Sequence, residues 1–202
     1  MKRISIGIIA GCMLISVKAQ PVKEIFITTP DVALLPLTAA HRMDLIDLYM
    51  NDQEAVVQNS FGDKVVLNHL TENYLNIQSG NATTELFILT LANESRIIGL
   101  IQTVCAPVCD SRLEFYSLKW KKLDTDLFIS LEGKSGFIKE DADSPALDIT
   151  LMEYHYDAEK QCLSQTYNTP AYASPEDREI IERTIREKNL TYQWNGIRFV
   201  RH

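Results

Sequence analysis

The sequence predicts an α+β fold, in which an antiparallel β-meander sheet packs against two helices and a C-terminal β-hairpin follows. Short apolar runs recur at regular spacing between turn residues through the middle of the chain, which is typical of antiparallel strands. Helical spacing of apolar residues flanks this region on both sides. Near the end of the chain, Asn195-Gly196 lies between two strand-like runs.

The first elements precede the meander. Residues 22–28 alternate imperfectly and predict a short strand, after which Pro30 and Pro36 interrupt the chain. The spacing then becomes helical, with Thr38 as the expected N-cap of a helix over 38–51. Its expected apolar stripe consists of Met43, Ile46, Leu48 and Tyr49.

The meander is expected to run from about residue 53 to 167. Its predicted strands are 53–59, 64–70, 74–79, 84–91, 96–105, 112–118, 127–131 and 147–156. Residues 92–95 separate the two longest runs and predict a hairpin.

The C-terminal third contains a second helix and a hairpin. Ser174 is the expected N-cap and Pro175 the first helical residue of a helix over about 175–188. Asn195-Gly196 predicts a type I′ turn within 192–200, because both residues tolerate positive φ.

The N-terminus has the pattern of a secretory signal peptide over residues 1–19. Lys2 and Arg3 precede an apolar run that is too short for a permanent membrane span. Small residues before Gln20 predict cleavage there, which leaves 20–202 as a single α+β domain. Lipidation at Cys12 is the less favoured alternative. The expected location is therefore the periplasm or the exterior of the cell, with no transmembrane segment after cleavage.

The charge of the chain narrows the choice of partners. Its net charge is −7, and loss of Lys2, Arg3 and Lys18 with the leader would make it −10. Nucleic acids and anionic membranes attract clustered Lys and Arg. We therefore expect an envelope protein or a surface polymer as the partner, and no nucleic acid.

Three cysteines remain after the leader: Cys105, Cys109 and Cys162. A disulfide could join any two of them, or all three could be free thiols, and the compartment permits either. The Cys105–Cys109 spacing is not a CxxC redox motif, and the scattered histidines predict no metal site.

No catalytic motif emerges, and no cofactor is expected. A Cys105–His155 dyad would require the fold to bring distant residues together. The acidic run at 140–144 lacks the central glycine of a calcium loop and predicts a solvated loop.

Aromatic residues concentrate in the second half of the chain. Tyr116, Trp120, Tyr154 and Tyr156 could form an exposed binding surface, whereas large aromatic side chains more often serve the core. Alternation in FYSLKW places Tyr116, Leu118 and Trp120 on one face and Phe115 on the other.

Several stretches occur in an order that resembles a family of uncharacterised exported proteins from gut-associated Bacteroidetes, defined by a domain of unknown function. These stretches are the signal peptide ending in KAQ, IFITTPDVALLPLTAAHRMDLIDLY, GDKVVLNHLTENYLNIQ, TVCAPVCDSRLEFYSLKW and YQWNGIRFV. The resemblance implies an envelope or secreted protein and supplies no activity, cofactor or catalytic residue. Cys109 is the less family-like member of the cysteine pair.

These observations favour a non-catalytic envelope protein with a binding or interaction role. The alternative is a small periplasmic hydrolase whose catalytic residues are distant in sequence. A hydrolase needs perturbed ionisable groups that converge on a concave pocket.

Overall fold

The computed structural model describes residues 20–34, 36–139 and 149–202. The helices within them are α1 (Val22–Ile27), α2 (Ala39–Met50), α3 (Thr169–Tyr172) and α4 (Pro175–Thr184), with short 3₁₀ turns η1 (Asp31–Ala33), η2 (Thr125–Leu127) and η3 (Lys134–Gly136). The strands are β1 (Val56–Gln58), β2 (Lys64–Leu70), β3 (Tyr74–Ser79), β4 (Ala82–Thr90), β5 (Arg96–Cys105), β6 (Cys109–Ser117), β7 (Lys122–Leu123), β8 (Met152–Asp157), β9 (Cys162–Tyr167), β10 (Asn189–Trp194) and β11 (Phe199–Arg201). The predicted signal peptide and the acidic run at 140–144 lie outside the described residues.

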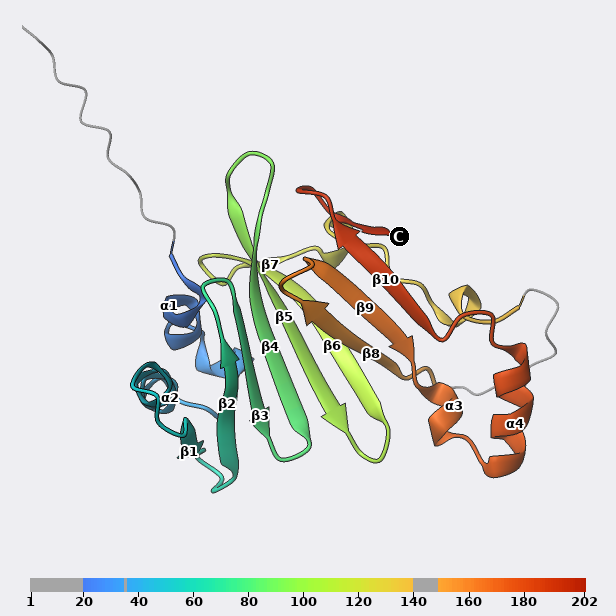
Figure 1. Ribbon diagram of the computed structural model, residues 1–202, viewed down its shortest axis with the longest axis horizontal. Helices are drawn as coiled ribbons and strands as arrows, with labels where there is room; N and C mark the ends of the chain where they lie inside the picture. The colour runs from blue at the N-terminus through green and yellow to red at the C-terminus, as the bar shows by residue number, and fades with distance from the viewer. Residues whose placement is uncertain (1–19, 35, 140–148) are drawn as a thin grey trace, which may run out of the picture.

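The strands form two antiparallel sheets (Figure 1). The large sheet is a meander in the order β1-β2-β3-β4-β5-β6-β7, and the small sheet has the order β11-β10-β9-β8. Figure 1 shows α1 and α2 near one end of this arrangement and α3 and α4 near the other. The predicted α+β class with an antiparallel meander is confirmed, and the strands divide between two sheets.

Alternation along the strands gives the large sheet two buried faces. On β4 and β5, Leu86 and Ile98 belong to a core shared with α1 and α2, whereas Phe87 and Ile97 belong to a core shared with the small sheet. Neighbouring residues of a strand point to opposite faces, and here both faces are buried. This explains why β4 and β5 are apolar at successive positions. The large sheet is therefore the middle layer, with α1 and α2 on one face and the small sheet on the other.

The prediction of a strand over 22–28 is wrong, because Val22–Ile27 form α1. Val22, Ile25 and Phe26 are fully buried and recur at the i, i+3, i+4 spacing of one helix face. The Val22 N–H donates to the Glu72 carbonyl, which ties the helix to the turn between β2 and β3.

The helix predicted over 38–51 is confirmed as α2, with Thr38 as its N-cap. Its buried face differs from the expected stripe, because Arg42, Leu45 and Ile46 are buried while Met43 is 46% exposed. The Arg42 guanidinium donates to the carbonyls of Ile27, Thr29 and Leu37 and pairs with Asp31 at 3.0 Å. A cation that satisfies several backbone acceptors can thus occupy a core position.

Side chains of the large sheet close the free edge of β8. The N–H groups of Met152, Tyr154 and Tyr156 donate to Asp110, Ser111 and Glu85, each at 3.0 Å. These donors would otherwise be free to pair with another strand. The three hydrogen bonds therefore fix the small sheet across β4 and β6.

Two local predictions, the strand over 127–131 and the type of the C-terminal turn, are wrong. Residues 127–131 form no strand, since the chain leaves η2 and inserts the fully buried Ile129 into the core. The C-terminal hairpin is confirmed, but its turn is not type I′. Four residues, 195–198, separate Trp194 from its partner Phe199, and the Asn195 Oδ1 accepts two backbone N–H groups.

Candidate functional site

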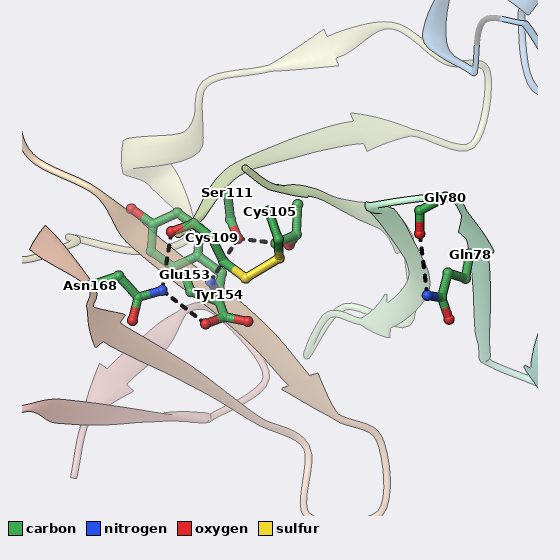
Figure 2. The surroundings of a disulfide bond; sticks show 9 residues. Gln78, Gly80, Cys105, Cys109, Ser111, Glu153, Tyr154 and Asn168 are labelled. Atoms are coloured by element: carbon green, nitrogen blue, oxygen red, sulfur yellow. Dashed lines mark hydrogen bonds between the residues drawn. A yellow bond between two sulfur atoms is a disulfide. The ribbon is translucent and has the colours of Figure 1, made fainter. Parts of the chain in front are cut away.

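The structure joins Cys105 and Cys109 in a disulfide, and Cys162 is a free cysteine (Figure 2). The two bonded residues are direct partners at the end of the β5–β6 hairpin. Figure 2 shows Asn168 donating to the Cys109 carbonyl and to Glu153, which connects the hairpin end to the small sheet. The disulfide removes Cys105 as a nucleophile and excludes a Cys105–His155 dyad in this state.

Removing the disulfide with the Cys105→Ser/Cys109→Ser variant is expected to lower the free energy of unfolding by about 2 kcal/mol. The chain-entropy model gives this value for a loop of about five residues. Urea unfolding with and without reductant measures it, with Cys162→Ser as the matched control. Loss of stability in the control but not in the double variant would contradict the structural role of the disulfide.

The four aromatic residues singled out from the sequence lie in two places. Tyr154 and Tyr156 belong to β8, where Tyr156 is buried and stacks on Phe87 with ring centroids 4.0 Å apart. Tyr116 and Trp120 lie on the helix-covered face of the large sheet, with ring centroids 5.2 Å apart. The first pair therefore serves the core between the sheets, where Tyr156 also lines a pocket beside Trp194, and the second pair lines a separate pocket.

This second pair lines a pocket of about 280 Å³, called here the Tyr116–Trp120 pocket. One wall comes from η1 and its neighbours and the other from β5, β6 and the turn that follows; the lining residues are Pro30, Val32, Ala33, Gln102, Arg112, Glu114, Tyr116 and Trp120. The Gln102 Nε2 donates to the Ala33 carbonyl at 3.1 Å and joins the two walls. Arg42 fixes the first wall through Asp31.

A buried carboxylate forms the polar side of the pocket. Glu114 is 5% exposed and accepts hydrogen bonds from Arg112, Lys122 and the Tyr116 Oη, the last at 2.9 Å. Burial raises the pKa of Glu114, but the hydrogen bonds from Lys122, Arg112 and Tyr116 outweigh burial and place its pKa below the ordinary value. Burial and the Glu114 hydrogen bond raise the pKa of Tyr116 to about 12. The pocket lining therefore contains one carboxylate and one cation, Arg112, and Lys122 contacts the same carboxylate from beside the pocket.

Trp120 adopts a backbone conformation that disfavours a bulky residue. It lies in the β6–β7 turn with a φ of 57°, and its N–H donates to the Ser117 carbonyl at 2.9 Å. A left-handed position of this kind costs a residue other than glycine about 1–3 kcal/mol. Within the described part of the chain, the buried Trp120 Nε1–H also finds no acceptor. The fold thus places an indole here at an energetic cost.

A second ionisable cluster lies between the sheets. The buried Glu85 accepts from the Tyr74 Oη at 3.1 Å and from the Tyr156 N–H, and its Oε1 is 3.0 Å from the His155 Nδ1. The hydrogen bond to Glu85 raises the pKa of His155 although partial burial opposes it. Each of these contacts joins β4 to β3 or β8, so the cluster has a structural role.

The Glu85–His155 pair is expected to make stability depend on pH. Because folding raises the pKa of His155, its contribution is complete below the unfolded value of about 6.5 and is lost as pH rises through the folded value. The His155 side chain is 61% exposed, so solvent screening limits the contribution to below about 1 kcal/mol. Unfolding of wild type and His155→Gln between pH 6 and 9 tests this, with His202→Gln as control. A wild-type advantage that grows with pH would contradict it.

Sequence reasoning found the two aromatic residues of the pocket but missed its polar residues. Alternation in β6 does carry a signal, because Arg112, Glu114 and Tyr116 share the face opposite Leu113 and Phe115. Pairing of Tyr116 with Lys122 depends on strand register, and the wall from Pro30 to Ala33 depends on tertiary packing.

The fold and the pocket define an antiparallel α+β protein with an aromatic, partly cationic recess on its helix-covered face. The family model described as "Protein of unknown function (DUF3256)" matches residues 14–199, and the chain belongs to this family. A solved structure titled "Structure of a domain of an uncharacterized protein from Porphyromonas gingivalis W83" is 24% identical, with a TM-score of 0.77. The match covers 91% of this chain and 100% of that one, and this likeness shows the fold alone. A comparison with curated proteins finds no match.

The family assignment agrees with the resemblance inferred from the sequence, and the Porphyromonas gingivalis protein adds a Bacteroidetes member of the same fold. Export stays a prediction. Among the described helices, none combines the length and apolarity that crossing a bilayer requires. The described residues also contain no cluster of three or more His, Cys, Asp and Glu side chains arranged to hold a metal ion.

Proposed function

We propose that the protein is an exported, non-catalytic binding protein of the cell envelope, and that it binds a surface polymer in the Tyr116–Trp120 pocket. The observation that carries this proposal is the strained Trp120. A glycine would occupy its left-handed position without strain, whereas the indole packs against the core and beside Tyr116 and leaves one side to line the pocket. Aromatic rings beside fixed polar groups are the usual means of orienting a ligand.

The size and shape of the pocket favour a polymer over a protein partner. A stable protein interface buries about 800 Å² on each side, which requires an extended surface. A recess of about 280 Å³ instead suits one unit of a repeating chain. A polymer also gains avidity from successive units without a large contact area.

The alternative of a hydrolase has one observation in its favour, the Glu85–His155 pair. A carboxylate that orients a histidine through Nδ1 resembles part of a hydrolytic triad. The same carboxylate, however, also accepts the Tyr74 hydroxyl and the Tyr156 N–H, which are contacts that join strands. The pair lies on the opposite face of the large sheet from the Tyr116–Trp120 pocket, so the geometry favours binding.

Affinity electrophoresis in native gels that contain neutral or acidic polysaccharides tests the proposal. We expect at least one polymer to retard wild type and the retardation to disappear in Trp120→Gly, which keeps a residue suited to the left-handed turn. Lys188→Ala, a change at an exposed residue directly before β10, is the matched control and should behave as wild type. Absence of retardation by every polymer, or equal retardation of Trp120→Gly, would overturn the proposal.

A further inference from the structure

The surroundings of the Tyr116–Trp120 pocket are cationic on a chain that is acidic as a whole. The β6–β7 turn places exposed Lys119 and Lys121 on either side of Trp120, and Lys122 follows at the start of β7. Glu114 is the one carboxylate that lines the pocket in the described structure, and it is shared between Arg112 and Lys122. Asp31, beside the other wall, is paired with Arg42. The local excess of positive charge contrasts with the net charge of −7.

The cations at the pocket keep unused hydrogen-bonding capacity. The side chains of Arg112 and Lys122 are 66% and 59% exposed, although each contacts Glu114. A guanidinium has five N–H donors and an ammonium has three, so each retains donors that can reach a ligand. Hydrogen bonds from such cations to a carboxylate are about twice as strong as neutral ones.

We propose that the pocket binds an anionic polysaccharide through one of its uronic acid units. The proposal rests on the proposed function and specifies the ligand class of the same site. The apolar face of the sugar ring lies on Trp120, and the ring carboxylate pairs with Arg112 and Lys122. Val32, which is 83% exposed, supplies an apolar wall opposite the aromatic rings.

Two other anionic partners fit the observations less well. An anionic membrane is bound by a protruding apolar face, whereas Trp120 is half-buried and borders a recess. Nucleic acid binding needs a basic surface that follows many phosphates, which a net charge of −7 opposes. A single carboxylated ring matches both the small volume and the local charge.

Calorimetric titration with trigalacturonic acid and with its methyl ester tests the proposal. The two probes share the sugar rings and differ in charge. We expect the acid to bind wild type at least tenfold more tightly than the ester at 50 mM salt, and this preference to shrink at 500 mM salt. Trp120→Gly should weaken binding of the acid at least tenfold, while Lys188→Ala leaves it unchanged.

Arg112→Gln and Lys121→Glu separate charge recognition from folding. Both should reduce the preference for the acid over the ester at least threefold. Lys121 is exposed, so its variant keeps the fold, and thermal unfolding checks both proteins. If acid and ester bind equally and both still require Trp120, the proposal of an anionic ligand is overturned, but the proposed function stands. Binding of either probe that is unchanged in Trp120→Gly would overturn both.

Discussion

Replacing Arg42 with methionine is expected to lower the free energy of unfolding by about 3–5 kcal/mol. The guanidinium is 1% exposed and satisfies the carbonyls of Ile27, Thr29 and Leu37. Methionine fills a similar volume but donates nothing, so several buried acceptors lose their partners at about 1–3 kcal/mol each. Urea unfolding followed by circular dichroism measures the change.

The neighbouring Met43 on α2 provides the matched control. It is 46% exposed, and Met43→Ala should change stability by less than about 0.5 kcal/mol. Because Arg42 holds the wall of the pocket through Asp31, Arg42→Met should also weaken ligand binding at temperatures where it remains folded. A loss of stability below about 1 kcal/mol would show that water replaces the guanidinium and that the residue does not organise this segment.

Gly99→Ala is expected to destabilise the protein by about 2–3 kcal/mol. A Cβ atom at this position would lie 2.2 Å from the Phe87 ring, which is fully buried. The ring cannot move aside, because it stacks on Tyr156 and meets Phe115 edge to face. Overpacking of this kind typically costs 1–3 kcal/mol. Equilibrium unfolding in urea measures the change.

A double variant tests whether the Phe87 ring is the cause. Phe87→Leu replaces the ring with a smaller side chain that lacks the clashing atoms, so Phe87→Leu/Gly99→Ala should lose at least about 1 kcal/mol less stability than the sum of the single variants. Gly133→Ala is the control, because a Cβ at Gly133 meets no atom within 4 Å. Additive losses in the double variant would contradict the packing described between the two sheets.

The sequence predicts most elements of this fold because their signals are local. Thr38 marks the start of α2, and turn residues separate β2 from β3 and β4 from β5. Burial of Arg42 could not be predicted, because its acceptors lie at the end of α1 and in the chain that follows it, and only tertiary packing brings them to α2. Strand periodicity also carries no information on which sheet a strand joins, so the division into two sheets required the structure.

The candidate site could likewise be predicted only where its signals are local in the sequence. The sequence predicts Tyr116 and Trp120 on one face, and they do share it, although β6 ends at Ser117 and Trp120 reaches that face from the β6–β7 turn. The carboxylate and cations beside them come together through the register of β6 with β7 and through the packing of η1. The Cys105–Cys109 disulfide was one of several pairings open from the sequence, and the register that places the two residues opposite each other selects it.

The central claim is that a ligand binds against Trp120, and the two indole N–H resonances of the ¹⁵N-labelled protein test it most directly. Trp194 provides an internal control, because its Nε1 donates to the Thr90 carbonyl at 3.1 Å between the sheets. Titration with trigalacturonic acid should shift the Trp120 resonance progressively and leave the Trp194 resonance in place. Binding detected by calorimetry that shifts the Trp194 resonance, or neither resonance, would contradict the account.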